Sequence, residues 1–358
     1  MRRFDLAPDY GRLAGALRDP ASLERLSASE FSRAMDAAQD ARLLGWFVAQ
    51  IDTGRIPQHA PPWLGDRVAT ARTLAAEYER SVRWEIDRLQ RAFLGSGVTW
   101  VLLKGAGYVA AGLEPGRGRR VADIDILVPE DDLPRTEALL HGAGWEFGEL
   151  DPYDTRYYRE WMHEIPPMVH RERRSVVDVH HAILPRTSRL KPSSARLFER
   201  AVPAGAELRV LAPAHMVLHG AAHLFHDGEI AGAIRDVVDL DQLLRRFGRE
   251  DSFWPDLARE AAVLGLTRPA YYALRYAREW FGTPVPDAVI EESARWAPPA
   301  PLRRLMDALV RRTIPGGGSM SQVAAYTLYL RSHWLRMPPL QVARHLARKS
   351  LRRYRPTP

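Results

Sequence analysis

The sequence predicts an α+β fold, in which a small mixed sheet lies between helical N-terminal and C-terminal regions. Short apolar runs typical of strands gather in the middle third, whereas apolar residues recur every three or four positions on either side of it, as in amphipathic helices. The 358 residues are 46% hydrophobic and 27% charged, which suits a globular protein of about two domains.

The N-terminal third is expected to be helical. A helix start is predicted at Asp19-Pro20, and residues 53–65 form a connector rich in Pro and Gly. Asp66 is then expected to cap a long helix that ends near Leu94, before Gly95-Ser-Gly97.

The middle third alternates between strand and helix patterns, which favours an α/β or α+β unit. In chain order, we expect strands at 98–103 and 123–128, a strand at 145–147 and one centred on 175–180, with a helical turn at 105–112, a basic loop at 114–120 and a helix at 129–141.

After Pro185 the pattern is helical again, with helices expected at 213–226, 229–247, across 250–312, and at 321–336 and 340–354. The chain therefore divides into four predicted regions, which are a helical region 1–96, a core 97–184, a helical region completing a cleft 185–312, and a basic helical tail 313–358.

Charge is uneven along the chain. Residues 308–358 contain ten Lys or Arg and no acidic residue, so the excess positive charge belongs to the tail. Such a tail suits an acidic partner, a membrane surface or nucleic acid. The alternative is a basic helix face that is exposed to solvent. We find no apolar run that predicts membrane insertion and no signal peptide pattern, so a cytoplasmic protein is expected. The absence of cysteine excludes disulfides and thiol nucleophiles.

The most informative motif is Asp123-Ile-Asp125. Side chains alternate along a strand, so both carboxylates share one face, where they repel each other unless a cation lies between them. Oxygen ligands of this kind suit Mg²⁺. The alternative is a pair of acids at a solvated strand edge. Asp178 lies in a second apolar strand, and it joins the same face if the two strands pair; three carboxylates then suit two Mg²⁺ ions, with Mn²⁺ as the alternative ion.

Leu103-Lys-Gly-Ala-Gly107 runs from a strand into a helix, where Lys104 can offer a charge and Gly105 a close backbone approach to a phosphate. It is neither a Walker loop nor a dinucleotide fingerprint. The alternative is a surface lysine beside a tight turn.

These features in this order resemble the nucleotidyltransferase superfamily with a DNA polymerase β-like fold, and more narrowly the bacterial uncharacterised nucleotidyltransferases with an LKG turn. The resemblance is carried by 102–106, 119–128 and 177–181. It implies an enzyme, a nucleotidyltransferase that moves a nucleoside monophosphate from an NTP such as ATP to an acceptor, with Asp123, Asp125 and Asp178 as catalytic metal ligands.

The resemblance also implies a set of nucleotide-binding residues, namely Lys104, Gly105, Arg119, Arg120, His180, His219, His223 and Asp236. Many superfamily members carry Gly-Ser where this chain has Lys104-Gly105, so the grip on the phosphates must differ. The acceptor is unknown, and a small molecule, peptide or protein is favoured over RNA.

Histidines at 215, 219, 223 and 226 share one face of a predicted helix. They bind a transition metal, face the nucleotide, or bond to Asp236 or Asp239 on the next helix. The stretch 153–163 lines an acceptor site or is an amphipathic segment over the sheet. Two rival functions remain, a D-x-D glycosyltransferase that uses a nucleotide sugar and a non-catalytic nucleotide-binding scaffold.

Overall fold

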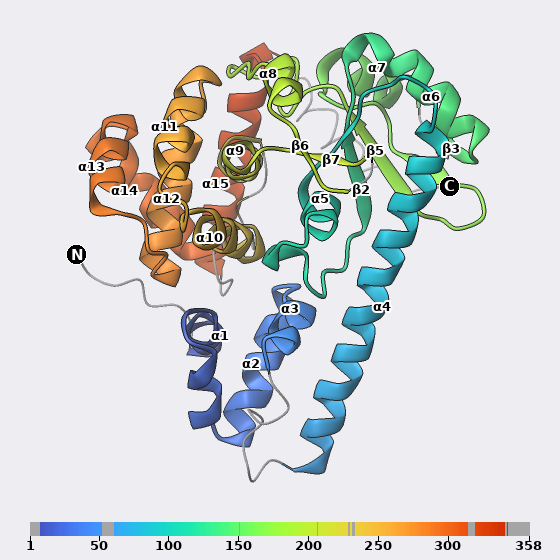
Figure 1. Cartoon of the computed structure of the whole chain (residues 1–358). Coiled ribbons are helices and arrows are strands. Elements are labelled where there is room, and N and C mark those ends of the chain that lie inside the picture. Colours follow the sequence, from blue (N-terminus) through green and yellow to red (C-terminus); the bar gives the residue numbers. More distant parts are fainter. Residues whose placement is uncertain are drawn as a thin grey trace.

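The computed structural model describes residues 8–51, 61–149, 151–205, 207–227, 230, 233–313, 319–340 and 342. Three parts lie around one continuous hydrophobic core (Figure 1). The first N-terminal helices form the lower part of the molecule, the sheet with its own helices forms the upper right, and the later helices form the upper left. This arrangement agrees with the α+β fold that the sequence predicts.

The N-terminal part contains three helices, of which the first packs on the second, the second on the third, and the third on the long helix that follows. They are α1 (Pro8–Arg18), α2 (Ala28–Asp40) and α3 (Leu44–Ala49), with the short 3-10 turn η1 (Pro20–Arg25) after α1. The predicted start at Asp19 is confirmed, because its side chain accepts a hydrogen bond from the Ala21 backbone at 3.0 Å.

Helix α4 (Pro62–Phe93) joins this part to the sheet as one continuous element of 32 residues. The predicted end near Leu94 is confirmed, but the predicted start is wrong, because the helix begins at Pro62 rather than at Asp66. Proline at the first helical position has its φ already set and lacks only an N–H that would find no partner there, so it starts the helix better than the later aspartate does.

The sheet has seven strands in the order β3-β4-β5-β2-β1-β7-β6. The strands are β1 (Val101–Leu102), β2 (Asp123–Leu127), β3 (Trp145–Phe147), β4 (Met168–His170), β5 (Val176–His180), β6 (Val202–Pro203) and β7 (Arg209–Val210). Three of them, β4, β6 and β7, were not predicted individually, because strands of two or three residues carry too little alternation to be recognised in the sequence.

The helices that accompany the sheet are α5 (Lys104–Ala110), α6 (Leu133–Gly142), α7 (Pro152–Trp161) and α8 (Ser194–Glu199), with 3-10 turns η3 (Glu114–Gly116) and η4 (Glu130–Asp132). The stretch 153–163 is therefore largely helical. Tyr153 stacks on Tyr157, and both rings meet Trp161 edge to face, which accounts for the aromatic pattern.

The C-terminal part is a group of helices, of which α9 packs against three others and is buried along most of its length. They are α9 (Pro213–Ala222), η5 (His223–Asp227, a π-helical turn), α10 (Ile234–Phe247), α11 (Phe253–Val263), α12 (Thr267–Phe281), α13 (Asp287–Ser293), η6 (Ala294–Trp296), α14 (Ala300–Thr313) and α15 (Ser319–Arg336).

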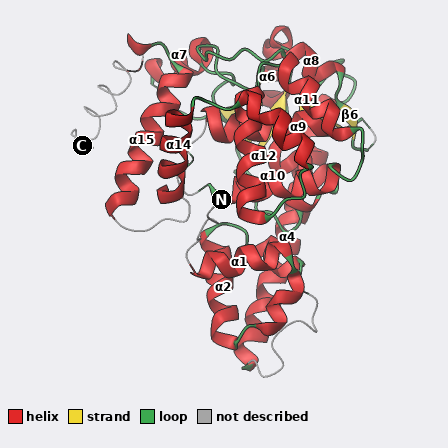
Figure 2. Cartoon of the chain, turned by 90° about the vertical axis from the view of Figure 1, so that its left-hand side faces the viewer, coloured by secondary structure: helices red, strands yellow, loops and turns green. Residues whose placement is uncertain are grey.

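Helices α14 and α15 lie side by side at one flank of the molecule (Figure 2). The predicted helix at 340–354 lies largely outside the described residues. Within the described residues, no helix combines the length and the apolarity that crossing a bilayer requires.

Two glycines fix the loop 114–120 against the N-terminal part. Gly118 has a positive φ of +59°, and a Cβ on it would lie 2.6 Å from the backbone of Gly45 in α3. Helix α3 and the loop therefore meet backbone to backbone, which only glycine permits on both sides. This contact sets the position of the arginine that follows, Arg119.

We expect Gly118→Ala to lower the free energy of unfolding by about 3 kcal/mol, because it adds both a left-handed backbone penalty and a backbone clash. Gly112→Ala is the matched control, since Gly112 has a similar φ of +63° but nothing within 4 Å of its added Cβ. It should cost only about 1 kcal/mol. Equal losses in denaturant unfolding would show that the Gly45 contact contributes nothing.

Candidate active site

The site is built on β2 and β5, which pair in parallel with Asp125 directly opposite Asp178. Residues opposite each other on paired strands point to the same face, so the pairing that the sequence analysis required is present. Asp123 lies two positions earlier on that face and is exposed, Asp125 is buried, and Asp178 is half-buried. Three carboxylates thus share one face of the β2–β5 pair.

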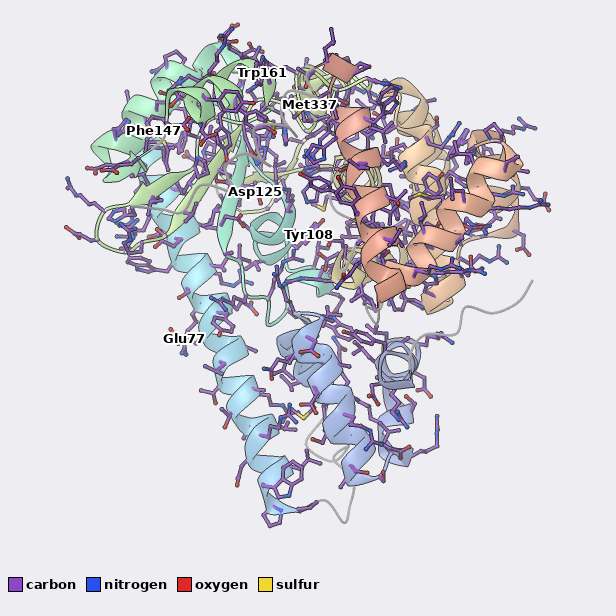
Figure 3. All side chains as sticks on the ribbon, turned by 180° about the vertical axis from the view of Figure 1, so that it is seen from behind. Glu77, Tyr108, Asp125, Phe147, Trp161 and Met337 are labelled. Carbon is purple, nitrogen blue, oxygen red and sulfur yellow. The ribbon has the colours of Figure 1, made fainter. Side chains whose placement is uncertain are left out.

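Asp125 is the centre of the polar contacts. Its Oδ1 accepts hydrogen bonds from Lys104 Nζ at 2.8 Å and from His180 Nε2 at 2.9 Å. Lys104 is the first residue of α5 and has a positive φ of +42°, a conformation that is costly for a residue with a side chain. Asp125 lies near the middle of the molecule, close to Tyr108, which belongs to α5 as Lys104 does (Figure 3).

The charges of this pair stabilise each other. Burial alone would lower the pKa of Lys104, but the carboxylate of Asp125, with Glu164 and Asp123, outweighs it and raises the pKa to about 12. Burial would likewise raise the pKa of Asp125, yet Lys104 and His180 hold it well below its usual range. Both groups are therefore charged at neutral pH.

Asp178 is in the opposite situation. Burial first, and then the negative charges of Glu164, Asp125 and Asp123, raise its pKa to about 7. Its Oδ1 is buried with no hydrogen-bond partner among the described residues. A carboxylate that lacks a partner and faces other carboxylates is suited to a divalent cation, and three oxygen donors match the ligand preference of Mg²⁺.

Arg119 makes an ion pair with Asp239 of α10 and lies 5.7 Å from the ring centroid of Tyr108. Arg119 also explains why residue 105 is a glycine, because a Cβ at that position would lie 2.7 Å from Arg119 Nε. The predicted phosphate role of Gly105 is not tested by this geometry, which instead gives it a steric role.

Two other predicted nucleotide-binding residues, Arg120 and Asp236, lie beside different elements. Arg120 is exposed, and its guanidinium lies 5.9 Å from the ring centroid of Tyr78 in α4. Asp236 lies near Arg119 and Asp239; burial and then the charge of Asp239 raise its pKa. The structure therefore brings Asp236 to the Arg119 pair, whereas Arg120 points toward the long helix.

The helix histidines do not act as one set. His215 Nε2 lies 2.8 Å from Glu260, and His226 Nε2 lies 2.8 Å from the Ser188 hydroxyl. Within the described part of the chain, no hydrogen bond joins His219 or His223 to Asp236 or Asp239, so that interpretation is wrong.

His219 and His223 instead lie within the electrostatic reach of Lys104. The positive charge of Lys104 and burial lower the pKa of His223 to about 3, and burial followed by Lys104 holds the pKa of His219 well below its usual value. Both imidazoles are neutral at pH 7. A neutral imidazole can donate and accept hydrogen bonds without adding charge.

Two residues beside the site were not predicted as site residues: His163 was included only as the last residue of the stretch 153–163, and Glu164 was not named. Glu164 forms an isolated β-bridge with His180, which places this segment next to β5. His163 lies with its ring centroid 5.1 Å from that of His180, and burial holds its pKa well below the usual value. No motif marks the pair, because only the bridge between distant segments brings them here.

A small mixed sheet with carboxylates on neighbouring strands, and a lysine at the start of the helix that precedes these strands in the chain, is the arrangement expected of a nucleotidyltransferase core. The profile of the uncharacterised nucleotidyltransferase family matches residues 27–282, and the chain belongs to that family. No curated protein and no solved structure matches it.

We expect Lys104→Met to raise the pKa of His223 from about 3 toward its ordinary value, because the lysine charge is the largest cause of the lowering. An NMR titration of the histidine resonances measures this. Lys191→Met is the control, since Lys191 is exposed and bonds to the Arg186 carbonyl. An unchanged His223 titration in Lys104→Met would contradict the described geometry.

Stability is expected to fall as pH drops below about 6.5. His226 has its pKa lowered to about 4 by burial and nearby arginines, so the unfolded chain takes up a proton that the folded chain excludes. The contribution is complete above pH 6.5 and is lost down to about pH 4, at up to about 1.4 kcal/mol per pH unit. Urea unfolding at pH 7 and 5 measures it, and His226→Gln should show a smaller loss than the parent protein.

Proposed function

We propose that the chain is a Mg²⁺-dependent nucleotidyltransferase that moves a nucleoside monophosphate from an NTP to a hydroxyl or phosphate of an acceptor. Family membership supports nucleotidyl transfer in general. The observation that carries the metal-dependent form is the parallel register of Asp125 with Asp178, where the latter keeps a buried oxygen without a partner among the described residues.

Asp123, Asp125 and Asp178 would hold the metal. When bound, Mg²⁺ supplies charge neutralisation on the triphosphate and lowers the pKa of the acceptor group. Asp178 is the ligand best suited to the acceptor side. Its pKa is raised because its carboxylate is buried beside other negative charges, and a bound cation would compensate them. The exposed Asp123 suits the side at which the NTP enters.

Lys104 is the cation nearest to the carboxylates. Its ammonium pairs with Asp125, and it would also be able to pair with a phosphate oxygen of a bound nucleotide. The side chain is half-buried and flexible along its methylenes, so the ammonium can move without moving α5.

The helical region would complete the nucleotide site. Neutral His219 and His223 lie near Lys104 and can donate hydrogen bonds to phosphate or base. Arg119 is held by Asp239, so we assign it to positioning of the Lys104-Gly105 turn rather than to direct phosphate contact.

Calorimetry with each of the four NTPs, with and without Mg²⁺, tests the proposal. We expect Mg²⁺-dependent binding of at least one NTP, weakened about 100-fold or more by Asp178→Asn, because a metal ligand is lost. Asp131→Asn is the control, since it removes the same charge from an exposed position beyond β2.

Transfer itself is measured by incorporation of α-labelled NTP into a panel of small-molecule, peptide and protein acceptors. We expect incorporation that Asp178→Asn abolishes and Asp131→Asn retains. Binding without incorporation into any acceptor would favour a scaffold, and hydrolysis of a nucleotide sugar with no NTP binding would favour a glycosyltransferase.

A further inference from the structure

A second group of metal-binding side chains lies beside the carboxylates. One nitrogen each of His163 and His180 and one oxygen of Glu164 lie within 4.8 Å of one another. The backbone holds them together, because the His181 N–H donates to the His163 carbonyl at 2.9 Å and the Ile165 N–H donates to the Val179 carbonyl at 3.0 Å. The group is thus fixed by backbone pairing between residues 163–165 and the end of β5, a strand inside the sheet.

Two of its atoms are buried without hydrogen bonds. The side chains of His163 and His180 are 6% and 1% exposed, and the Nδ1 of each finds no partner among the residues that the structure describes. A buried polar nitrogen without a partner is destabilising, so such atoms call for a ligand. Two in neighbouring rings, with a carboxylate beside them, favour a cation.

The hydrogen bond between His180 and Asp125 points the same way. His180 Nε2 lies 2.9 Å from Oδ1 of Asp125, an oxygen that also accepts from Lys104 Nζ at 2.8 Å, so Nε2 is the donor in this bond. In the neutral ring Nδ1 then presents a lone pair, and it lies 3.4 Å from a Glu164 oxygen, beyond ordinary hydrogen-bond length.

That spacing fits metal ligands. Ligands at about 2.0–2.1 Å from a tetrahedral ion lie about 3.3 Å apart, close to the separation of His180 Nδ1 and Glu164. A histidine that donates its other ring N–H to a carboxylate is also the usual partner of a bound metal, and Asp125 supplies that carboxylate.

We propose that His163, Glu164 and His180 form a binding site for a divalent first-row transition metal ion of the Zn²⁺ type. Two imidazoles and one carboxylate suit such an ion and disfavour Mg²⁺, which selects oxygen donors. The site shares no ligand with the three aspartates, and the proposal does not depend on nucleotidyl transfer. Its structural effect is to fix His180, and through it the buried oxygen of Asp125.

Zinc calorimetry on the full chain, stripped with a chelator and kept in excess Mg²⁺, tests the site. We expect one Zn²⁺ per chain, with binding weakened about 10-fold to 100-fold or more in Glu164→Gln and in His163→Gln. Circular dichroism checks that each variant folds, and Glu164 is half-buried, so its replacement leaves the core intact. His226→Gln is the control, as a buried histidine outside the group.

Substitution with Co²⁺ gives a second readout, because tetrahedral Co²⁺ with nitrogen ligands absorbs visible light strongly. No Zn²⁺ binding by the parent protein, or equal binding in both variants, would overturn the proposal. Binding lost in Asp178→Asn but kept in His163→Gln would place the ion on the aspartates and overturn it too. Because Mg²⁺ and NTP binding are measured separately, failure here leaves the proposed transfer reaction standing.

Discussion

A single buried oxygen of Asp125 organises the centre of this protein. It accepts from a lysine that begins α5 and from a histidine that ends β5, so the turn after β1 and the two central strands are held to one another by charge as well as by the sheet. A buried carboxylate is tolerated only when such partners compensate its lost hydration. The strained backbone of Lys104 is consistent with this, because the ion pair holds the residue there.

The helical region also contributes side chains to the surroundings of this centre. Asp239 of α10 binds Arg119, and α9 and η5 bring the neutral imidazoles of His219 and His223 near Lys104. His215 instead bonds to Glu260, and both of these side chains are fully buried. The family profile spans residues 27–282, which include the N-terminal helices from Ser27 onward, the sheet and α9 to α12. The matched unit is therefore the carboxylate face together with the helices that complete it.

Local patterns in the sequence predicted the carboxylate face, because strand alternation alone puts Asp123 with Asp125 on one side, and the pairing of β2 with β5 then adds Asp178. The same patterns could not predict which partner a charge would choose. Arg119 meets Asp239 across 120 residues, and Glu164 reaches His180 through one isolated bridge. Such contacts depend on packing between distant elements, for which a single sequence carries no local signal.

Helix α4 links the two ends of the molecule without a break, over about 48 Å at 1.5 Å per residue. Its buried residues pack on α3 at one end and on α5 and α6 at the other. The number of residues between the two contacts therefore fixes the angle between them around the helix axis. Adding or deleting one residue between them would turn one contact by about 100° relative to the other. The exposed face of α4 can thus vary in sequence, whereas its length is fixed by geometry, and natural insertions in this protein should fall outside it.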